Sequence, residues 1–385
     1  ALRMLNIGAK GLTDHPFEIK NPLQIIKHPT DKRIFAIQKA LSKGASVDKL
    51  HKLSNIDKWF LYHLADIVRT SSKLQASRLT LELLREAKQK GFADSVIAKL
   101  QNTSEEQIRS RRITNGIVPA IKQIDTLAGE FDATTNYLYT TYHGNTHDIA
   151  PLKKPIVIIG SGPYCIGSSV EFDWCAVNTA KTMRAHKLPT IMINSNPETV
   201  STDFDRSDRL YFEELTLEKI RDIADFENPR SIVVSVGGQI ANNLALPLHK
   251  TGYPIIGTSP EQIDRAEDRQ KFSSMLNKIG VDQPKWTQVS TLALAKKFAR
   301  SVGYPVLIRP SYVLSGGAMN VVSDERELKR YLHDATRLSP DHPVVISQFI
   351  SNAKELEIDG VAQNGELLIY AISEHIENAG VHSGD

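Results

Sequence analysis

The sequence predicts an α/β protein that carries an all-α domain in its N-terminal part. Over residues 1–150, apolar residues recur at spacings of three and four, as in SVDKLHKLSNIDKWFLYHLADIVRT, which is typical of packed amphipathic helices. From Pro155 on, short apolar runs alternate with helical patterns: PIVIIG, PTIMIN, SIVVSV and YPIIGT. Such runs indicate a parallel sheet covered on both faces, so we expect a doubly wound α/β domain that ends near Thr258. The remaining residues, 259–385, mix strands and helices.

Length and composition restrict the class of protein. With 385 residues, of which 41% are hydrophobic, the chain can form two or three domains with separate cores. No stretch approaches the roughly 18 consecutive apolar residues of a membrane span, and the first residues lack the pattern of a secretory signal. The only cysteines, Cys165 and Cys175, argue against a disulfide framework and fit a reducing compartment. We therefore expect a cytoplasmic protein with no membrane partner.

The charge distribution gives little support to nucleic-acid binding. The net charge is +3, although the first 150 residues carry an excess of Lys and Arg. Residues 80–112 could form a helix-turn-helix with a basic second helix, but packed helix pairs are common and no second signal accompanies this one. We expect no nucleic-acid partner.

The stretch RPSYVLSGGAMNVV, residues 309–322, places an arginine and two glycines between two apolar runs. Glycines let the backbone approach a ligand closely, and a guanidinium makes paired hydrogen bonds to phosphate. A β-hairpin turn is the alternative interpretation. Because PVLIRPS otherwise resembles a buried strand, the charge of Arg309 needs a partner. Arg269, in a predicted helix, is a second phosphate candidate, for which a solvated surface position is the alternative.

Three polar or glycine-rich turns follow strands of the predicted α/β domain. IIGSGPYCIGSS has Gly160 and Gly162 spaced as in a dinucleotide fingerprint, but Gly167 falls five residues after Gly162 rather than three. A nicotinamide-dependent oxidoreductase is therefore a minor alternative. NSNPETVSTDFD and VGGQIANN lie where ligands of α/β sheets bind, with a self-hydrogen-bonded loop and tight helix packing as their respective alternatives.

Acidic and histidine side chains gather in the last 40 residues. Glu355, Glu357 and Asp359 alternate along a predicted strand and should project from one face of it, towards either solvent or a nucleotide. In the stretch EHIENAGVHSGD, we expect His375, Glu377 and His382 to form a neighbourhood for a cation or a phosphate.

Taken together, a series of motifs resembles the large component of carbamoyl phosphate synthetase from end to end. The motifs are, in order, SSVEFDWCAV, NPETVSTDFD, LYFEELTLE, VGGQ, GTSPEQIDRAEDRQKF, RPSYVLSGGAM and HIENAGVHSGD. That enzyme has two homologous halves, and NPETVSTDFD with RPSYV resembles the second half, which phosphorylates carbamate. Ser315 and Ala318 beside the two glycines, and Cys165, depart from the bacterial pattern. They favour a eukaryotic multifunctional protein of the pyrimidine pathway, with an arginine or urea pathway and a mitochondrial location as the alternative.

The resemblance implies a domain order and a set of partners. Residues 1–19 resemble the tail of the first half, 20–150 a helical oligomerisation domain, 151–258 a pre-ATP-grasp domain, and 259–385 the opening part of the second ATP-grasp domain. The implied partners are the rest of the synthetase chain, a glutaminase domain or subunit as ammonia source, and further copies of the chain. The magnesium ligands are expected beyond residue 385, so this piece is expected to be inactive alone.

The resemblance also implies ATP and Mg²⁺ as cofactors and assigns a role to each matching residue. Arg269 and Arg309 correspond to nucleotide-phosphate ligands, and the glycine-rich loop over the phosphates contains Ser315, Gly316 and Gly317. The adenine hinge is Gln348, Phe349 and Ile350; the ribose ligand is Glu355; and His382 lies beside the phosphates, so that Arg309 and His382 are the expected catalytic residues. His375 and Glu377 correspond to a monovalent cation site, which K⁺ would fill.

The implied activity is ATP-dependent phosphorylation of carbamate to carbamoyl phosphate. One alternative is a scaffold for oligomerisation without catalysis of its own. Another is a different ATP-grasp carboxylate ligase, which would share the arginines and the glycine loop but would have no reason to carry NPETVSTDFD.

Overall fold

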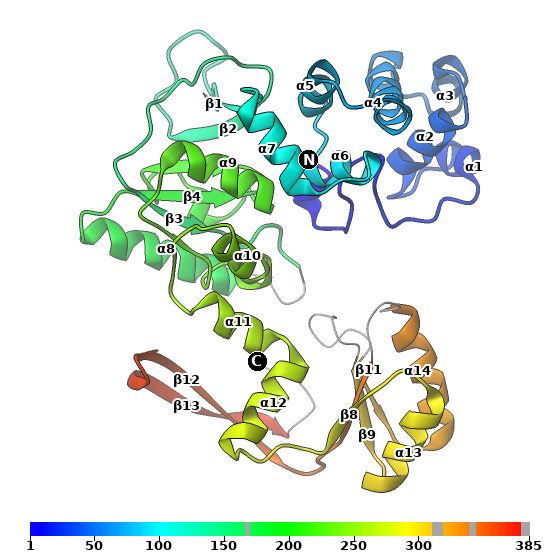
Figure 1. Cartoon of the computed structure of the whole chain (residues 1–385), viewed down its shortest axis with the longest axis vertical. Coiled ribbons are helices and arrows are strands. Elements are labelled where there is room, and N and C mark those ends of the chain that lie inside the picture. The colour runs from blue at the N-terminus through cyan, green and yellow to red at the C-terminus, as the bar shows by residue number, and fades with distance from the viewer. Residues whose placement is uncertain (166–169, 310–318, 339–343, 379–385) are drawn as a thin grey trace. The chain divides into compact units, whose positions relative to one another are not determined.

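The computed structural model describes the chain except for residues 166–169, 310–318, 339–343 and 379–385 (Figure 1). The side chains of residues 269, 334–338, 377 and 378 are also outside the description. The chain divides into two compact units, Ala1–Asp264 and Arg265–Asp385, and each has a hydrophobic core of its own. Among the described residues, no helix combines the length and the apolar character needed to cross a membrane.

The first unit begins with helices, as the spacing of apolar residues predicts. They are α1 (Pro22–Lys27), α2 (Arg33–Ser42), α3 (Val47–Ser54), α4 (Lys58–Ala76), α5 (Leu81–Gln89), α6 (Asp94–Leu100) and α7 (Glu105–Thr114). Their apolar faces form two clusters, one around Phe35 and Leu50 and the other around Leu84 and Ile97. Ser104 begins α7 with a capping box, in which its hydroxyl accepts from the Gln107 N–H and the Gln107 side chain accepts from the Ser104 N–H.

A seven-stranded sheet forms the second layer of this unit, in the order β1-β2-β5-β4-β3-β6-β7. Its strands are β1 (Ala120–Gln123), β2 (Tyr137–Thr141), β3 (Ile156–Ile159), β4 (Thr190–Asn194), β5 (Arg209–Phe212), β6 (Ser231–Val233) and β7 (Ile255–Ile256). All pairs are parallel except β1 with β2. The four apolar runs seen in the sequence are β3, β4, β6 and β7, which confirms the predicted parallel sheet.

Helices cover both faces of this sheet, so the doubly wound arrangement is confirmed. Alternate residues of β3 belong to different cores: Val157 and Ile159 pack in one, Ile156 and Ile158 in the other. The helix α8 (Val170–Ala185) contributes to the second core, whereas α9 (Leu217–Glu227) and α10 (Gly238–Lys250) contribute to the first. The helix α11 (Pro260–Glu267) follows the sheet.

The residue patterns before Pro155 predict no strand, yet β1 and β2 extend the sheet at one edge. Their residues, AIKQ and YLYTT, are only partly buried and include polar side chains. Short, partly exposed strands of this kind lack the continuous apolar run that identifies β3 and β4. The pairing of β2 with β5 therefore depends on a contact between distant parts of the chain.

A buried cluster of charges joins the helices to the sheet layer. Lys88 Nζ lies 2.8 Å from Asp94 Oδ1 and 2.5 Å from Glu218 Oε1, so α5 and α6 are tied to α9. Arg112 of α7 continues the cluster, with its Nε 2.6 Å from Asp94 Oδ2 and its Nη2 2.7 Å from Asp222 Oδ1. All five side chains are buried. Because buried charges are tolerated only when paired, this cluster fixes how the helices lie on α9.

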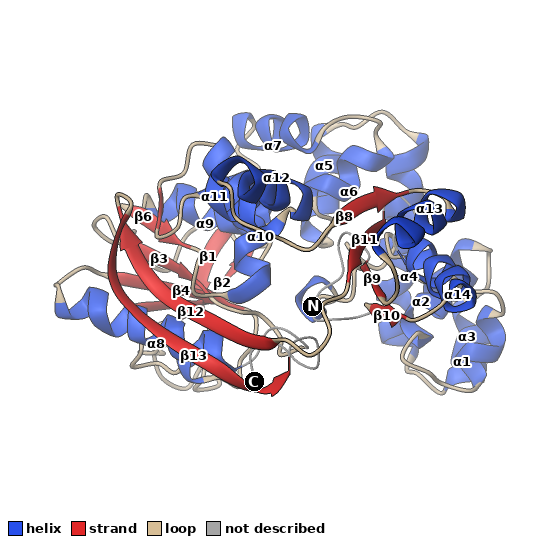
Figure 2. Ribbon diagram, turned by 90° about the horizontal axis from the view of Figure 1, so that it is seen from below, coloured by secondary structure: helices blue, strands red, loops and turns tan. Residues whose placement is uncertain are grey.

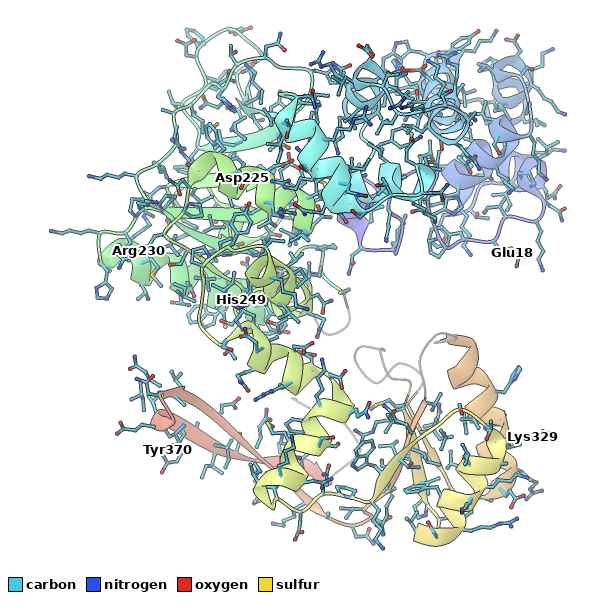
Figure 3. The ribbon with its side chains drawn as sticks, viewed as in Figure 1. Glu18, Asp225, Arg230, His249, Lys329 and Tyr370 are labelled. Carbon is cyan, nitrogen blue, oxygen red and sulfur yellow. The ribbon has the colours of Figure 1, made fainter. Side chains whose placement is uncertain are left out.

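The same cluster extends to the surface of α9. Arg109 contacts Asp222 at 2.6 Å and also pairs with Asp225, which is half-exposed and is labelled in Figure 3. We call Lys88, Asp94, Arg109, Arg112, Glu218 and Asp222 the charge cluster. Its three cations balance its three carboxylates. Tyr142 lies beside it, with Lys88 Nζ 5.2 Å from the ring centroid, and its hydroxyl donates to Asp222.

Acid should weaken the first unit through Glu218. Burial disfavours the ionised form of this carboxyl, but Lys88 and the N–H of Asp94 more than offset that effect and lower its pKa from 4.5 to about 2. The folded-state pKa is depressed, so Glu218 contributes stability above pH 4.5 that is lost as the pH falls towards 2. We expect the Glu218→Gln variant to show a flatter decline of unfolding free energy across this window. Urea unfolding at a series of pH values measures it, and equal slopes for both proteins would contradict the assignment.

The second unit contains a four-stranded antiparallel sheet, in the order β10-β9-β11-β8. The strands are β8 (Trp286–Val289), β9 (Val306–Arg309), β10 (Asn320–Val322) and β11 (Val344–Gln348). The helices α13 (Leu292–Val302) and α14 (Glu325–Leu338) pack on one face of it. The unit also has α12 (Arg269–Ile279) and a long hairpin of β12 (Lys354–Gln363) and β13 (Glu366–Asn378) (Figure 2).

Candidate nucleotide-binding site

The structure describes part of the site that the sequence predicts. Arg309 is the last residue of β9, and Gln348 ends β11 directly before Phe349 and Ile350. Arg269 is the first residue of α12, whose N-cap Asp268 accepts from the Lys271 N–H at 2.9 Å. The remaining predicted residues or side chains lie outside the description: Ser315, Gly316, Gly317 and His382, and the side chains of Arg269 and Glu377.

Arg309 lies on the face of the four-stranded sheet that is opposite α13 and α14. Val306 and Ile308 of β9 belong to the core under those helices, so the alternate residues Leu307 and Arg309 project from the other face. The register places Arg309 opposite Val345 of β11. Arg309 is half-buried at the end of this strand. An arginine so held has little freedom to lose on binding an anion.

The other strands contribute neighbours to this face. Ser347 of β11 is opposite Leu307 on one side and Trp286 on the other, and Gln288 of β8 is opposite Val345. We call this surface the Arg309 face; it comprises Trp286, Gln288, Leu307, Arg309, Val345 and Ser347. It combines apolar side chains with a cation, a primary amide and a hydroxyl. Such a mixture suits a ligand that has both flat apolar and charged parts.

The backbone fixes the predicted hinge at the end of β11. The Gln348 N–H donates to Lys285 O at 2.8 Å, and the Phe349 N–H donates to Pro305 O at 3.2 Å. Ile350 follows with its side chain 52% exposed. A fixed backbone beside an exposed apolar side chain could receive an adenine ring, which has two apolar faces and a polar edge.

The hairpin holds the predicted ribose and cation residues. A register shift between Lys354 and Leu356 interrupts the ladder at Glu355, whereas Glu357 is directly opposite Ser373. The expectation that Glu355 shares one regular face with Glu357 and Asp359 therefore depends on a strand that is irregular at Glu355. His375 Nε2 lies 3.0 Å from Glu357 Oε2. The described residues contain no group of three or more His, Cys, Asp and Glu side chains suited to a metal ion, and the cation site stays a prediction.

The polar loops after β3 and β4 are held together by Asn194. This buried side chain accepts, through Oδ1, from the N–H groups of Gly162 at 3.0 Å, Ser195 at 2.8 Å and Asn196 at 3.4 Å. The Ser201 N–H donates to Asp173 of α8 at 3.1 Å. These bonds match the self-hydrogen-bonded loop that the sequence analysis leaves as an alternative. Because the Gly162 N–H already donates to Asn194, it is not available to the phosphate of a dinucleotide.

Two glycines are required where β3 ends. A Cβ on Gly160 would lie 2.6 Å from the Asn194 side chain, and one on Gly237 would lie 2.4 Å from the Ile159 carbonyl oxygen. The side chain of Asn194 and the end of β3 thus use the space that a methyl group would need. Tight packing therefore accounts for Gly237 of VGGQIANN.

We expect Gly237→Ala to destabilise the first unit by about 3 kcal/mol or more, because the obstructing atom belongs to the backbone of a central strand. Gly252→Ala is the control. Gly252 has φ +92° and no neighbouring atom within 4 Å of a Cβ, so only backbone strain of about 1–2 kcal/mol applies. Urea unfolding followed by circular dichroism compares the two. A loss for Gly237→Ala no greater than that for Gly252→Ala would contradict the packing argument.

Comparison with known protein families identifies three successive regions. Residues 1–116 match the carbamoyl-phosphate synthetase large chain oligomerisation domain, and residues 152–265 match the carbamoyl phosphate synthase preATP-grasp domain. Residues 268–384 match the carbamoyl-phosphate synthase L chain ATP binding domain. The chain belongs to the carbamoyl phosphate synthetase large-chain family. The resemblance drawn from the motifs is thereby confirmed, and the Arg309 face, the hinge and the hairpin all lie within the ATP-binding domain.

Relatives in this family come from more than one kind of synthetase. The chain is 58% identical over 359 residues to the carbamoyl phosphate synthase arginine-specific large chain of Cutaneotrichosporon cutaneum, covering 92% of this chain and 30% of the relative. It is 53% identical over 390 residues to the multifunctional protein URA2 of Saccharomyces cerevisiae, covering 100% and 18%. It is 52% identical over 394 residues to the mitochondrial carbamoyl-phosphate synthase [ammonia] of Rattus norvegicus, covering 100% and 26%. The chain therefore spans less than a third of the length of these relatives, and they do not decide between the pathways.

Proposed function

We propose that this chain forms part of the site at which a longer protein phosphorylates carbamate with ATP, giving carbamoyl phosphate and ADP. By full-length enzyme we mean a protein that contains this chain together with the remaining length of its relatives. The observation that carries the proposal is the position of Arg309. Arg309 is half-buried at the end of β9, it directly precedes a glycine-rich stretch in the sequence, and it lies within the matched ATP-binding domain.

The described residues fit a nucleotide. The Arg309 face offers a guanidinium and apolar side chains on one surface, and Ile350 at the hinge is exposed beside a fixed backbone. ATP, when bound, supplies the phosphoryl group that carbamate receives. Arg309 would hold phosphate oxygens by charge-assisted hydrogen bonds and offset the charge that develops on them during transfer. The hinge would fix the base, and Glu355 would accept hydrogen bonds from ribose hydroxyls.

Further residues complete the proposed site. Arg269, His382 and the loop residues Ser315, Gly316 and Gly317 would add contacts to the phosphates, and His375 with Glu377 would hold a monovalent cation such as K⁺. Mg²⁺ would be held against the ATP phosphates by side chains beyond residue 385, since it commonly needs only one or two protein carboxylates besides the phosphate oxygens. We derive no step of the reaction from Mg²⁺. Carbamate decomposes in water, so the site should exclude solvent while phosphoryl transfer takes place.

The proposed partners follow from the domain order. The match of residues 1–116 to an oligomerisation domain supports self-association through the helices α1–α7, which sedimentation velocity would measure. The rest of the synthetase chain and a glutaminase domain or subunit would supply carbamate and ammonia. A cytoplasmic location is supported by the two free and exposed cysteines, Cys165 and Cys175. A mitochondrial location is the alternative, and immunodetection in cell fractions distinguishes the two.

Carbamoyl phosphate formation from ATP and bicarbonate tests the function of the full-length enzyme. We expect product with ammonia as nitrogen source, and also with glutamine if a glutaminase is attached. A folded full-length enzyme that forms none with either source would overturn the proposal and favour the scaffold interpretation. Equal product formation by a variant that lacks residues 260–385 would also overturn it, because the site proposed here would then not be used.

A further inference from the structure

We propose that the hydroxyl of Ser347 is a ligand of the nucleotide's adenine base. The inference rests on the proposed function, since it requires a nucleotide on the Arg309 face, and it adds a residue that the motifs do not mark. Ser347 directly precedes the hinge residues Gln348, Phe349 and Ile350 in the sequence. It therefore lies where the strand ends and the expected adenine contact begins.

Strand geometry places Ser347 on the same face as Arg309. Val344 and Ile346 of β11 belong to the core beneath α13 and α14, so Val345 and Ser347 project from the opposite face. In the pairing of β9 with β11, Arg309 is opposite Val345 and Leu307 is opposite Ser347, so all four side chains project from the same face. Along the strand the two positions are separated by two residues, or roughly 7 Å. A single nucleotide could thus meet a cation at one point of the face and a hydroxyl at another.

The hydroxyl of Ser347 has no hydrogen-bond partner within the described structure. The side chain is only 7% exposed, and its Oγ atom is buried and unpaired. A buried hydroxyl without a partner is destabilising, because it has lost its hydrogen bonds to water and gained none in return. Groups of this kind are rare in folded proteins, and a ligand is one means by which they acquire a partner.

The surroundings of Ser347 suit a base rather than a phosphate. Its cross-strand neighbours on this face are Leu307 and Trp286, both with apolar side chains that are half-buried. A phosphate needs cations or several N–H donors. The cation of this face, Arg309, is opposite Val345, two residues along β11 from Ser347. Adenine has flat apolar faces and a polar edge with an amine donor and ring-nitrogen acceptors. A serine hydroxyl both donates and accepts, so it can bond to that edge.

Paired substitutions separate the hydroxyl from the volume of the side chain. Ser347→Thr keeps the hydroxyl, whereas Ser347→Val has nearly the same shape without it, and both residues are favoured in strands. The assay is ATP formation from ADP and carbamoyl phosphate by the full-length enzyme, the reverse of the step that the proposed function assigns to this nucleotide site. We expect Ser347→Val to raise the KM for ADP about tenfold with little change in kcat, and Ser347→Thr to stay within about twofold of the unsubstituted enzyme.

Thr287→Val is the matched control, because it removes a hydroxyl from β8 on the opposite face of the same sheet. Thr287 is opposite Ile346, which belongs to the helix-covered core. We expect this variant to leave the KM for ADP unchanged. A KM rise equal to that of Ser347→Val would mean that the effect comes from the sheet as a whole and would overturn the inference.

Thermal unfolding without nucleotide gives an independent readout. If the hydroxyl has no internal partner, Ser347→Val should unfold at no lower temperature than Ser347→Thr. A lower unfolding temperature for Ser347→Val would reveal an internal bond and overturn the inference. Equal KM values for the Thr and Val variants would also overturn it while the proposed function stands. Absence of ATP formation by the folded, unsubstituted enzyme would overturn both.

Discussion

Replacement of Arg112 by methionine is expected to destabilise the first unit by about 3–5 kcal/mol. Arg112 is fully buried between Asp94 and Asp222, and its removal leaves the charge cluster with two cations for three carboxylates. The uncompensated charge cannot reach water, because Asp94 and Asp222 are themselves buried. Since Asp94 belongs to α6 and Asp222 to α9, the loss should loosen the helices from the sheet layer. Urea unfolding of the chain followed by far-ultraviolet circular dichroism measures the change.

Arg69→Met is the matched control for Arg112→Met. Arg69 also pairs with an aspartate, Asp66, but its side chain is 66% exposed on α4. Water stabilises both charges when such a pair is broken, so we expect a change within about 0.5 kcal/mol. Similar losses for the two variants would show that burial of the cluster adds nothing, which would contradict its assigned role.

Replacement of Arg309 by alanine is expected to reduce the rate of ATP formation from ADP and carbamoyl phosphate at least about 100-fold. This is the size expected when a group that stabilises developing charge in the transition state is lost. Arg309 is the last residue of β9, and its side chain projects from the face opposite α13 and α14. Its removal should therefore leave the core of Val306 and Ile308 intact. We therefore expect the loss to appear in kcat/KM, with a circular dichroism spectrum like that of the unsubstituted enzyme.

Arg300→Ala controls for the loss of an arginine from the same unit. Arg300 belongs to α13, is 71% exposed and pairs with Glu325 of α14. It lies on a helix rather than on the Arg309 face, and we expect less than a twofold change in rate. If Arg309→Ala had no larger effect than Arg300→Ala, Arg309 would not be a phosphate ligand.

Residue patterns were sufficient to predict the elements that carry continuous or periodic apolar residues. The strands β3, β4, β6 and β7 and the amphipathic helices before them follow from such patterns, because burial on both faces or on one stripe requires them. The strands β1 and β2 have no such requirement, since they are partly exposed. Their place in the sheet depends on pairing with β5, which no local pattern shows.

The charge cluster shows a second limit of sequence reasoning. Lys88, Asp94 and Arg112 lie on helices whose pattern resembles an ordinary solvated polar face. Their burial comes from Glu218 and Asp222 on α9, more than 100 residues away in the chain. Long-range pairing of this kind is a property of the folded chain, and a single sequence does not contain a signal for it.

In the candidate site, the motifs identified residues by type and order, but they could not identify surfaces. Arg309 and the hinge residues were selected because of RPSYVLSGG and the family resemblance. The sequence gives no reason to select Ser347, because a serine at the end of an apolar run carries no sign that its hydroxyl lacks a partner. That became visible only from the register of β11 and the burial of Oγ. The register shift at Glu355 is likewise set by pairing within the hairpin.

The most direct test of the account is ATP formation by the full-length enzyme from ADP and carbamoyl phosphate, without bicarbonate or a nitrogen source. This partial reaction needs only the site to which we assign Arg309. We predict ATP formation that depends on carbamoyl phosphate and is lost in the Arg309→Ala variant. A correctly folded enzyme that forms no ATP, or one whose ATP formation is unaffected by Arg309→Ala, would contradict the assignment of carbamate phosphorylation to this site.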